Sequence, residues 1–214
     1  MGIELLYYGI ALVISISVHE CTHAFVALLL GDSTARHMGR LTLNPLAHFD
    51  QMGAIMLLAT KFHFGWGKPV QFNPARLKDP KRDSMLIALS GPFSNFCLAV
   101  LFSLFLRFLA FAWPEVFLAP STGLSAIIDF STTMVVLNLS LMVFNLIPIP
   151  PLDGSKILLL LLPGDALFTL QRYQQVGYMI LLSLVFSNLL FGKSILGLIM
   201  DPVVGFFLNR MLPF

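Results

Sequence analysis

The sequence predicts an all-α polytopic protein that crosses a membrane several times. Of its 214 residues, 57% are hydrophobic and only 11% are charged, and the mean hydropathy is +0.85. Soluble domains carry about 25% charged residues, so this composition favours an integral membrane protein. We expect four to five transmembrane helices in a single domain over residues 1–214, with a core at residues 3–163 and C-terminal helices at residues 173–212.

Four apolar runs are long enough to cross the hydrocarbon core as helices, which takes about 20 residues. They lie at residues 3–30, 84–113, 123–147 and 173–191. A fifth run, residues 195–212, contains Asp201-Pro202, which would kink a span. A tilted transmembrane helix and an interfacial helix fit this fifth run equally well.

The distribution of basic residues predicts the orientation. The connection at residues 31–83 holds eight Lys and Arg residues, whereas the connection at residues 114–122 holds none. Basic residues are enriched in cytoplasmic loops, so the long connection is expected in the cytoplasm and the N-terminus outside. The net charge of +2 follows from this topology and favours no nucleic-acid partner.

Residues 62–74, FHFGWGKPVQFNP, lie between the first two predicted spans. The glycines and the first proline exclude a stable helix, while Val70 and Phe72 alternate with Gln71 and Asn73 as in a short strand. An aromatic, glycine-rich loop that rests in the membrane interface is the alternative.

The first apolar run contains His19-Glu20-Cys21-Thr22-His23, an HExxH motif. A helix turns about 100° per residue, so His19 and His23 come within about 40° of each other and can reach one cation. In such motifs two histidines bind zinc, and the glutamate takes a proton from the water that the metal activates. Ionisable groups inside a span are costly, which favours a functional interpretation over a chance match.

A hydrolytic zinc site needs a third protein ligand and an open position for water. Asp153 is the strongest candidate, because it follows three prolines that end the third predicted span. Irregular backbone at membrane depth is tolerated mainly where it is buried or lines a cavity. A surface Asp-Gly turn is the alternative. The other candidates are His37, His48, His63, Asp129 and Asp201.

Amides in the predicted spans allow two interpretations. Gly91-Pro92 is expected to open the second helix, and Asn95 then either bonds between helices or serves a site. Asn145 either caps carbonyls freed near Pro148 or serves the same site. Asn138 is expected to be an ordinary interhelical hydrogen-bonding residue.

Three motifs, in this order, resemble those of the site-2 proteases, which are intramembrane zinc metalloproteases. They are HExxH at residues 19–23, GPxxN at residues 91–95 and NxxPxxxLDG at residues 145–154. Residues 39–50, GRLTLNPLAHFD, also look like the stretch that follows the first catalytic helix in that family. No part of the chain resembles a PDZ or CBS domain, so a minimal catalytic core is expected.

The resemblance implies a role for several side chains. His19, His23 and Asp153 are expected to bind one Zn²⁺ per chain, with Glu20 as the catalytic general base. Asn95 and Asn145 are expected to bind the substrate peptide or its oxyanion.

The resemblance also suggests that residues 62–74 form a short membrane-associated β-hairpin. A helical substrate hides its amides in i to i−4 hydrogen bonds, so its cleavage requires local unwinding. Val70, Gln71 and Phe72 are therefore expected to bind the extended substrate by β-augmentation.

The implied activity is hydrolysis of a peptide bond in or near the transmembrane segment of a membrane-bound regulatory protein. Such a substrate is a membrane-held transcription factor or an anti-sigma factor, and the implied location is a prokaryotic cell membrane with the active site open to the cytoplasm. A non-enzymatic metal-binding or transport protein, or an inactive family member, is the alternative. Glu20 favours the enzyme, because transport needs ligands but no base beside them.

Overall fold

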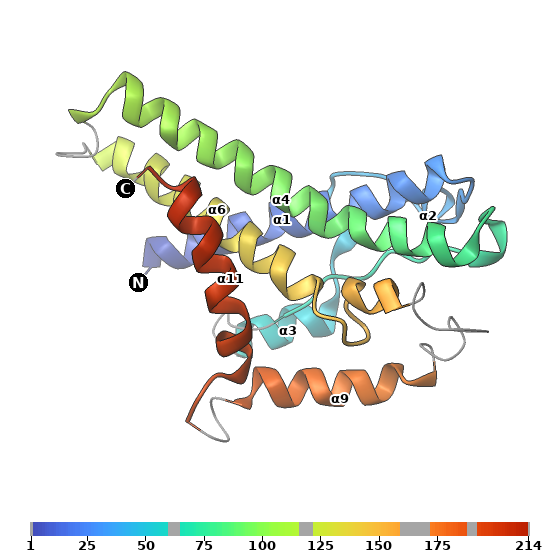
Figure 1. Cartoon of the computed structure of the whole chain (residues 1–214). Helices are drawn as coiled ribbons and strands as arrows, with labels where there is room; N and C mark the ends of the chain where they lie inside the picture. The colour runs from blue at the N-terminus through green and yellow to red at the C-terminus, as the bar shows by residue number, and fades with distance from the viewer. Residues whose placement is uncertain (1, 60–64, 116–121, 159–171, 188–191, 214) are drawn as a thin grey trace.

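A computed structural model describes residues 2–59, 65–115, 122–158, 172–187 and 192–213 (Figure 1). These residues form seven α-helices and three short 3-10 turns, and no strand occurs among them. The α-helices are α1 (Gly2–Leu29), α2 (Thr34–His37), α3 (Gln51–Ala59), α4 (Pro80–Ala112), α6 (Thr122–Asn145), α9 (Gln174–Val185) and α11 (Ile195–Met211). The 3-10 turns are η1 (Pro45–His48), η2 (Pro74–Arg76) and η3 (Asp153–Ile157). The all-α prediction is confirmed.

Three of the described helices are long and apolar enough to cross a membrane, namely α1, α4 and most of α6. They pack against one another, with Ala11 and Leu12 of α1 meeting Met134 and Leu137 of α6. The total of four to five spans is not confirmed. The described helix in the fourth predicted span, α9, has 12 residues and is about 18 Å long, short of the roughly 30 Å hydrocarbon core. Residues 188–191 of that span lie outside the described part.

Helix α4 begins earlier than predicted and continues through Pro92. Asp79 caps its N-terminus by accepting a hydrogen bond from the Arg82 amide at 3.1 Å, and Pro80 occupies the first turn, where no amide hydrogen is required. The prediction that Gly91-Pro92 opens this helix was wrong. Pro92 is buried, and packing against α1 and α6 keeps the helix continuous around it.

Helix α11 contains Pro202 and crosses α6 steeply (Figure 1). Val204 packs with buried residues of α4 and α6. At the end of α11 the Arg107 side chain donates to the Met211 carbonyl at 3.0 Å, and the Ser103 hydroxyl donates to the same carbonyl. Because the last carbonyls of a helix have no intrahelical partner, these bonds attach α11 to α4.

The segment at residues 65–73 contains neither helix nor strand pairing, so the predicted β-hairpin is not confirmed; residues 62–64 lie outside the described part. The amides of this segment have other partners. The Lys68 amide donates to the His48 carbonyl at 2.8 Å, and the Val70 amide donates to the Glu20 carboxylate at 2.8 Å. Arg40 donates to the carbonyls of Lys68 and Pro69, so the segment is held by side chains and loops.

Asp32 fixes the far end of this segment to the end of α1. Its buried carboxylate accepts hydrogen bonds from Thr34 and from the Asn73 amide, and it lies 3.8 Å from Arg76. Burial opposes ionisation, but these hydrogen bonds and Arg76 hold the pKa of the Asp32 carboxyl below its usual range. Asp32 thus carries the negative charge that these contacts require.

Helix α9 packs against the proline turn that follows α6. Leu181 is buried with Ile147 and Leu152, and a Cβ on Gly177 would lie 2.1 Å from the Pro150 carbonyl oxygen. The peptide bond between Pro150 and Pro151 is cis. Only glycine allows this approach of α9 to the turn.

Replacing Gly177 by alanine should therefore separate α9 from the turn and destabilise the protein by about 1–3 kcal/mol, the usual cost of overpacking. Thermal unfolding of the detergent-purified protein measures this change. Gly205→Ala, in α11, is the matched control, because a Cβ there would contact nothing within 4 Å. Equal melting temperatures for the two variants would contradict the packing described here.

Candidate metal centre

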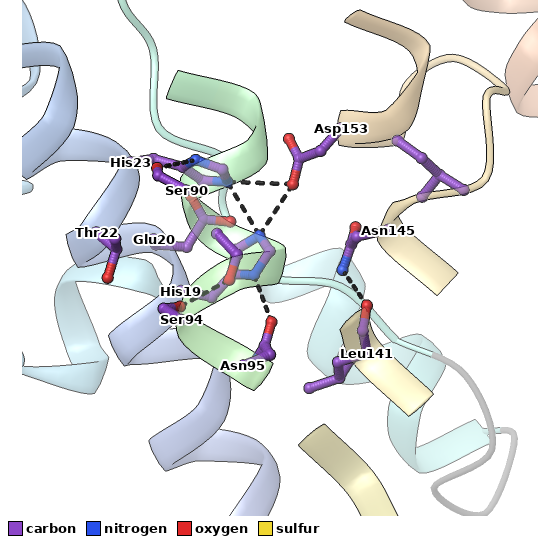
Figure 2. Close-up of polar contacts among 12 residues, drawn as sticks. His19, Glu20, Thr22, His23, Ser90, Ser94, Asn95, Leu141, Asn145 and Asp153 are labelled. Carbon is purple, nitrogen blue, oxygen red and sulfur yellow. Dashed lines mark hydrogen bonds and ion pairs between the residues drawn. The ribbon is translucent and has the colours of Figure 1, made fainter. Parts of the chain in front are cut away.

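His19 and His23 lie one turn apart on α1 and face the inside of the helix bundle (Figure 2). Their ring centroids are 4.6 Å apart, and their Nε2 atoms are 3.0 Å apart. Both residues are buried, with exposed fractions of 8% for His19 and 7% for His23. The helical spacing of HExxH thus places both imidazoles at one point, as the sequence predicted.

Asp153 reaches the same point from η3, beyond the end of α6. Its Oδ2 atom lies 3.1 Å from His19 Nε2 and 3.2 Å from His23 Nε2. Gly154 allows the turn to fold back on α6, because a Cβ there would lie 2.2 Å from the Leu146 carbonyl oxygen. The Lys156 ammonium is 3.8 Å from the other Asp153 oxygen.

The protonation pattern of the two histidines shows that this cluster suits a cation. His23 Nδ1 lies 2.7 Å from the Ile87 carbonyl, which can only accept, so Nδ1 carries the proton. His19 Nδ1 lies 2.7 Å from Asn95 Oδ1 and carries its proton for the same reason. Both Nε2 lone pairs therefore point at each other and at a carboxylate oxygen, an arrangement that is repulsive unless a positive charge lies among them.

The donor set and its spacing fit zinc. Zn²⁺ prefers imidazole nitrogen and carboxylate oxygen at about 2.0–2.2 Å, and tetrahedral ligands at that distance lie about 3.4 Å apart. The three candidate atoms are 3.0 to 3.2 Å apart. The donor atoms and their spacing therefore match a three-ligand zinc site.

Gly91 of α4 lets the second helix approach the cluster. A Cβ on Gly91 would lie 2.5 Å from atoms of both imidazole rings. Any side chain at this position would therefore displace His19 or His23. The glycine of the GPxxN motif thus has a structural role that the sequence did not indicate, since Gly91 packs directly on the two histidines.

A cavity of about 410 Å³ opens beside the cluster. Glu20 lines this cavity next to the two histidines, and its Oε2 accepts the hydrogen bond of the Val70 amide. Apolar side chains of α1, α6 and α9 form one part of the remaining wall, among them Ile16, Leu141, Phe144, Leu181 and Leu182, and residues of the 65–73 segment form another. The cluster is therefore reached through a largely apolar space.

The structure divides the predicted substrate-binding residues into two groups. Asn145, Val70 and Phe72 line the cavity, whereas Asn95 and Gln71 are not among its lining residues. Asn95 is fully buried and contacts His19. Sequence reasoning missed Lys156, which lines the cavity and lies over the Phe72 ring at 5.3 Å, although its position three residues after Asp153 was a signal.

The other candidate ligands lie elsewhere. His37 bonds to the Ser33 carbonyl at the surface, and His48 bonds to the Thr42 carbonyl. Asp129 and Asp201 belong to α6 and α11 and are not part of the cluster, while His63 lies outside the described residues. In the described part of the chain, His19, His23 and Asp153 are the set that could hold a metal.

Comparisons with known proteins give the family of this chain. The family described as Peptidase family M50 matches residues 7–126 and 120–188. The chain is 39% identical over 184 residues to the "Putative zinc metalloprotease YwhC" of Bacillus subtilis (strain 168). These residues are 86% of this chain and 81% of that relative.

A second relative is the "Putative zinc metalloprotease Rip2" of Mycolicibacterium smegmatis. It is 30% identical over 176 residues, which are 81% of this chain and 64% of that protein. No solved structure gives a significant match. Because the family match extends over most of the chain and includes all three motifs, the chain belongs to peptidase family M50, the site-2 protease family of membrane-embedded zinc metalloproteases.

Proposed function

We propose that His19, His23 and Asp153 hold the zinc ion of this metalloprotease and that Glu20 is its general base. The observation that carries the proposal is the convergence of two Nε2 lone pairs and one carboxylate oxygen beside Glu20. The cluster lies where α1, α4 and the turn after α6 meet, so the proposed site is within the bundle of spanning helices.

Bound zinc acts as a Lewis acid that acidifies water and polarises a carbonyl. Glu20 accepts the proton of the attacking water at its carboxylate and passes it to the leaving amine. Asn145 donates to the developing oxyanion through one N–H of its side-chain amide, while the other bonds to the Leu141 carbonyl at 3.0 Å. The apolar wall limits water to the small polar part of the cavity.

The substrate that this site suits is an apolar peptide, unwound near the scissile bond. The lining of α1, α6 and α9 matches a transmembrane segment of a membrane-bound regulatory protein, such as a membrane-held transcription factor or an anti-sigma factor. The 65–73 segment runs along the same cavity and receives the unwound main chain. Since α9 lines the cavity and α11 packs on α4 and α6, residues 1–214 act as one domain.

The site opens to the cytoplasm in a prokaryotic cell membrane. The basic connection joins the end of α1, just after the histidines, to the beginning of α4. The end of α6 leads into the turn that holds Asp153. Positive residues mark the cytoplasmic side, so this common end faces the cytoplasm and the N-terminus lies outside.

Glu20→Gln should retain about one zinc ion per chain and lose at least about 100-fold of the cleavage rate, the usual contribution of a general acid or base. Asp153→Asn should lose both zinc and cleavage, because it removes the charged ligand. Elemental analysis and cleavage of a transmembrane substrate in detergent measure the two effects. Wild-type cleavage by Glu20→Gln would refute its role as the base, and full zinc content in a His19→Ala, His23→Ala double variant would refute the ligand assignment.

The cysteine of a Lys78→Cys variant should not react with a membrane-impermeant thiol reagent in intact cells, because the 31–83 connection is cytoplasmic in our proposal. It should react after the cells are permeabilised. A cysteine in place of Glu115 should react in intact cells, because the 114–122 connection is external in our proposal. Both variants are made in a Cys21→Ala, Cys97→Ala background, since these are the native cysteines. The opposite labelling pattern would reverse the topology.

Val70→Pro should lower kcat about 10- to 100-fold relative to Val70→Ala, because proline removes the amide that holds Glu20 and a hydrogen bond to a charged group is worth about 1.5–3 kcal/mol. Gln71 does not itself line the cavity, but it lies between Val70 and Phe72, which do, and our proposal assigns its main-chain amide to the extended substrate. Gln71→Pro should therefore raise KM relative to Gln71→Ala. Steady-state cleavage kinetics separate the two effects. Equal KM values for both Gln71 variants would remove this residue from the proposed substrate contact.

A further inference from the structure

Asn138 of α6 is joined to the proposed zinc ligand His19 through two hydrogen bonds. Its side chain is fully buried, and its Oδ1 atom lies 2.9 Å from Asn95 Nδ2 of α4. Asn95 Oδ1 lies 2.7 Å from His19 Nδ1 of α1. Three spanning helices therefore contribute to one chain of buried polar contacts, which ends behind the cluster (Figure 2 shows its last step).

The orientation of the Asn138 amide is determined by its other partners. Its nitrogen lies 2.8 Å from the Met134 carbonyl, which can only accept. The same nitrogen lies 2.9 Å from Ser15 Oγ, whose own proton is donated to the Ala11 carbonyl at 2.7 Å. Both N–H groups of Asn138 are thus used, and its oxygen must face Asn95.

The orientation of Asn138 determines the orientation of Asn95. An inverted Asn95 would direct its oxygen at the oxygen of Asn138 and its N–H groups at His19. Because the amide is fully buried, that repulsion would not be relieved by solvent. Asn95 therefore presents its oxygen to His19, and the proton of the imidazole stays on Nδ1. The lone pair of His19 Nε2 is left for the metal.

We propose that Asn138 is a positioning residue for zinc binding, which acts through Asn95 on the tautomer and ring orientation of His19. This inference rests on the proposed zinc ligands. It also changes the role of Asn95 from the predicted substrate contact to support of a ligand, in agreement with its full burial and its position away from the cavity lining. A ligand histidine depends on the partner of its other nitrogen in this way.

The test is the zinc affinity of the detergent-purified, metal-free protein, measured by competition with a chromophoric chelator. Asn138→Leu keeps the side-chain volume and removes the contacts, so zinc should bind about 10-fold more weakly, the lower end of the 10- to 100-fold effect of such partners. Asn138→Ala replaces Asn138→Leu if the latter cannot be purified.

Two controls separate positioning from general stability. Leu139→Ala removes a buried neighbour on the same helix that takes no part in the polar chain, and it should lower thermal stability without changing zinc affinity. In an Asn95→Leu background, Asn138→Leu should have no further effect on zinc affinity, because the connection is already broken.

The outcomes distinguish this inference from the proposed ligands. Wild-type zinc affinity in Asn138→Leu would overturn the positioning role, and so would equal losses of zinc affinity in Asn138→Leu and Leu139→Ala. In either case the ligand assignment would stand if His19→Ala abolishes zinc binding. Undiminished zinc affinity in His19→Ala would overturn the ligand assignment itself.

Discussion

The close contact between α1 and α4 at Gly91 is the constraint on which the rest of the site depends. A Cβ at this position would lie 2.5 Å from both imidazoles. Because Gly91 has no side chain, α1 and α4 come close enough for the imidazole rings to contact the α4 backbone. That approach brings His23 Nδ1 to the Ile87 carbonyl and His19 Nδ1 to Asn95, both on α4. The absence of a side chain at Gly91 thus determines the position of His19 and His23 and of the groups that orient their rings.

Three buried polar side chains in this bundle are hydrogen-bonded to one another across neighbouring helices. A polar side chain in a low-dielectric interior is costly unless it is hydrogen-bonded, and a fully bonded set holds its members in one arrangement. Ser15, Asn95 and Asn138 form such a set across α1, α4 and α6. The same bonds that join the helices determine which nitrogen of His19 is available. Helix association and site geometry therefore share one set of contacts.

The backbone of the connection between α1 and α4 contacts the candidate site. Arg40 binds the carbonyls before Val70, Asp32 binds the Asn73 amide, and the Val70 amide bonds to Glu20. These contacts hold residues 68–73 along the cavity although no strand pairs with them in the described part of the chain. A proposed substrate segment thus shares a hydrogen bond with the proposed base.

Much of the site could be predicted from the sequence, because helical periodicity brings His19 and His23 together and the proline-rich turn marks Asp153. Composition likewise determined the all-α membrane class. The sequence could not decide how α4 meets α1, because the effect of Gly91 depends on which atoms lie opposite it. For the same reason Asn138 and Asn95 looked like ordinary interhelical amides or substrate contacts. Only the packing of three helices, far apart in sequence, decided which acceptor each N–H faces and hence what each amide does.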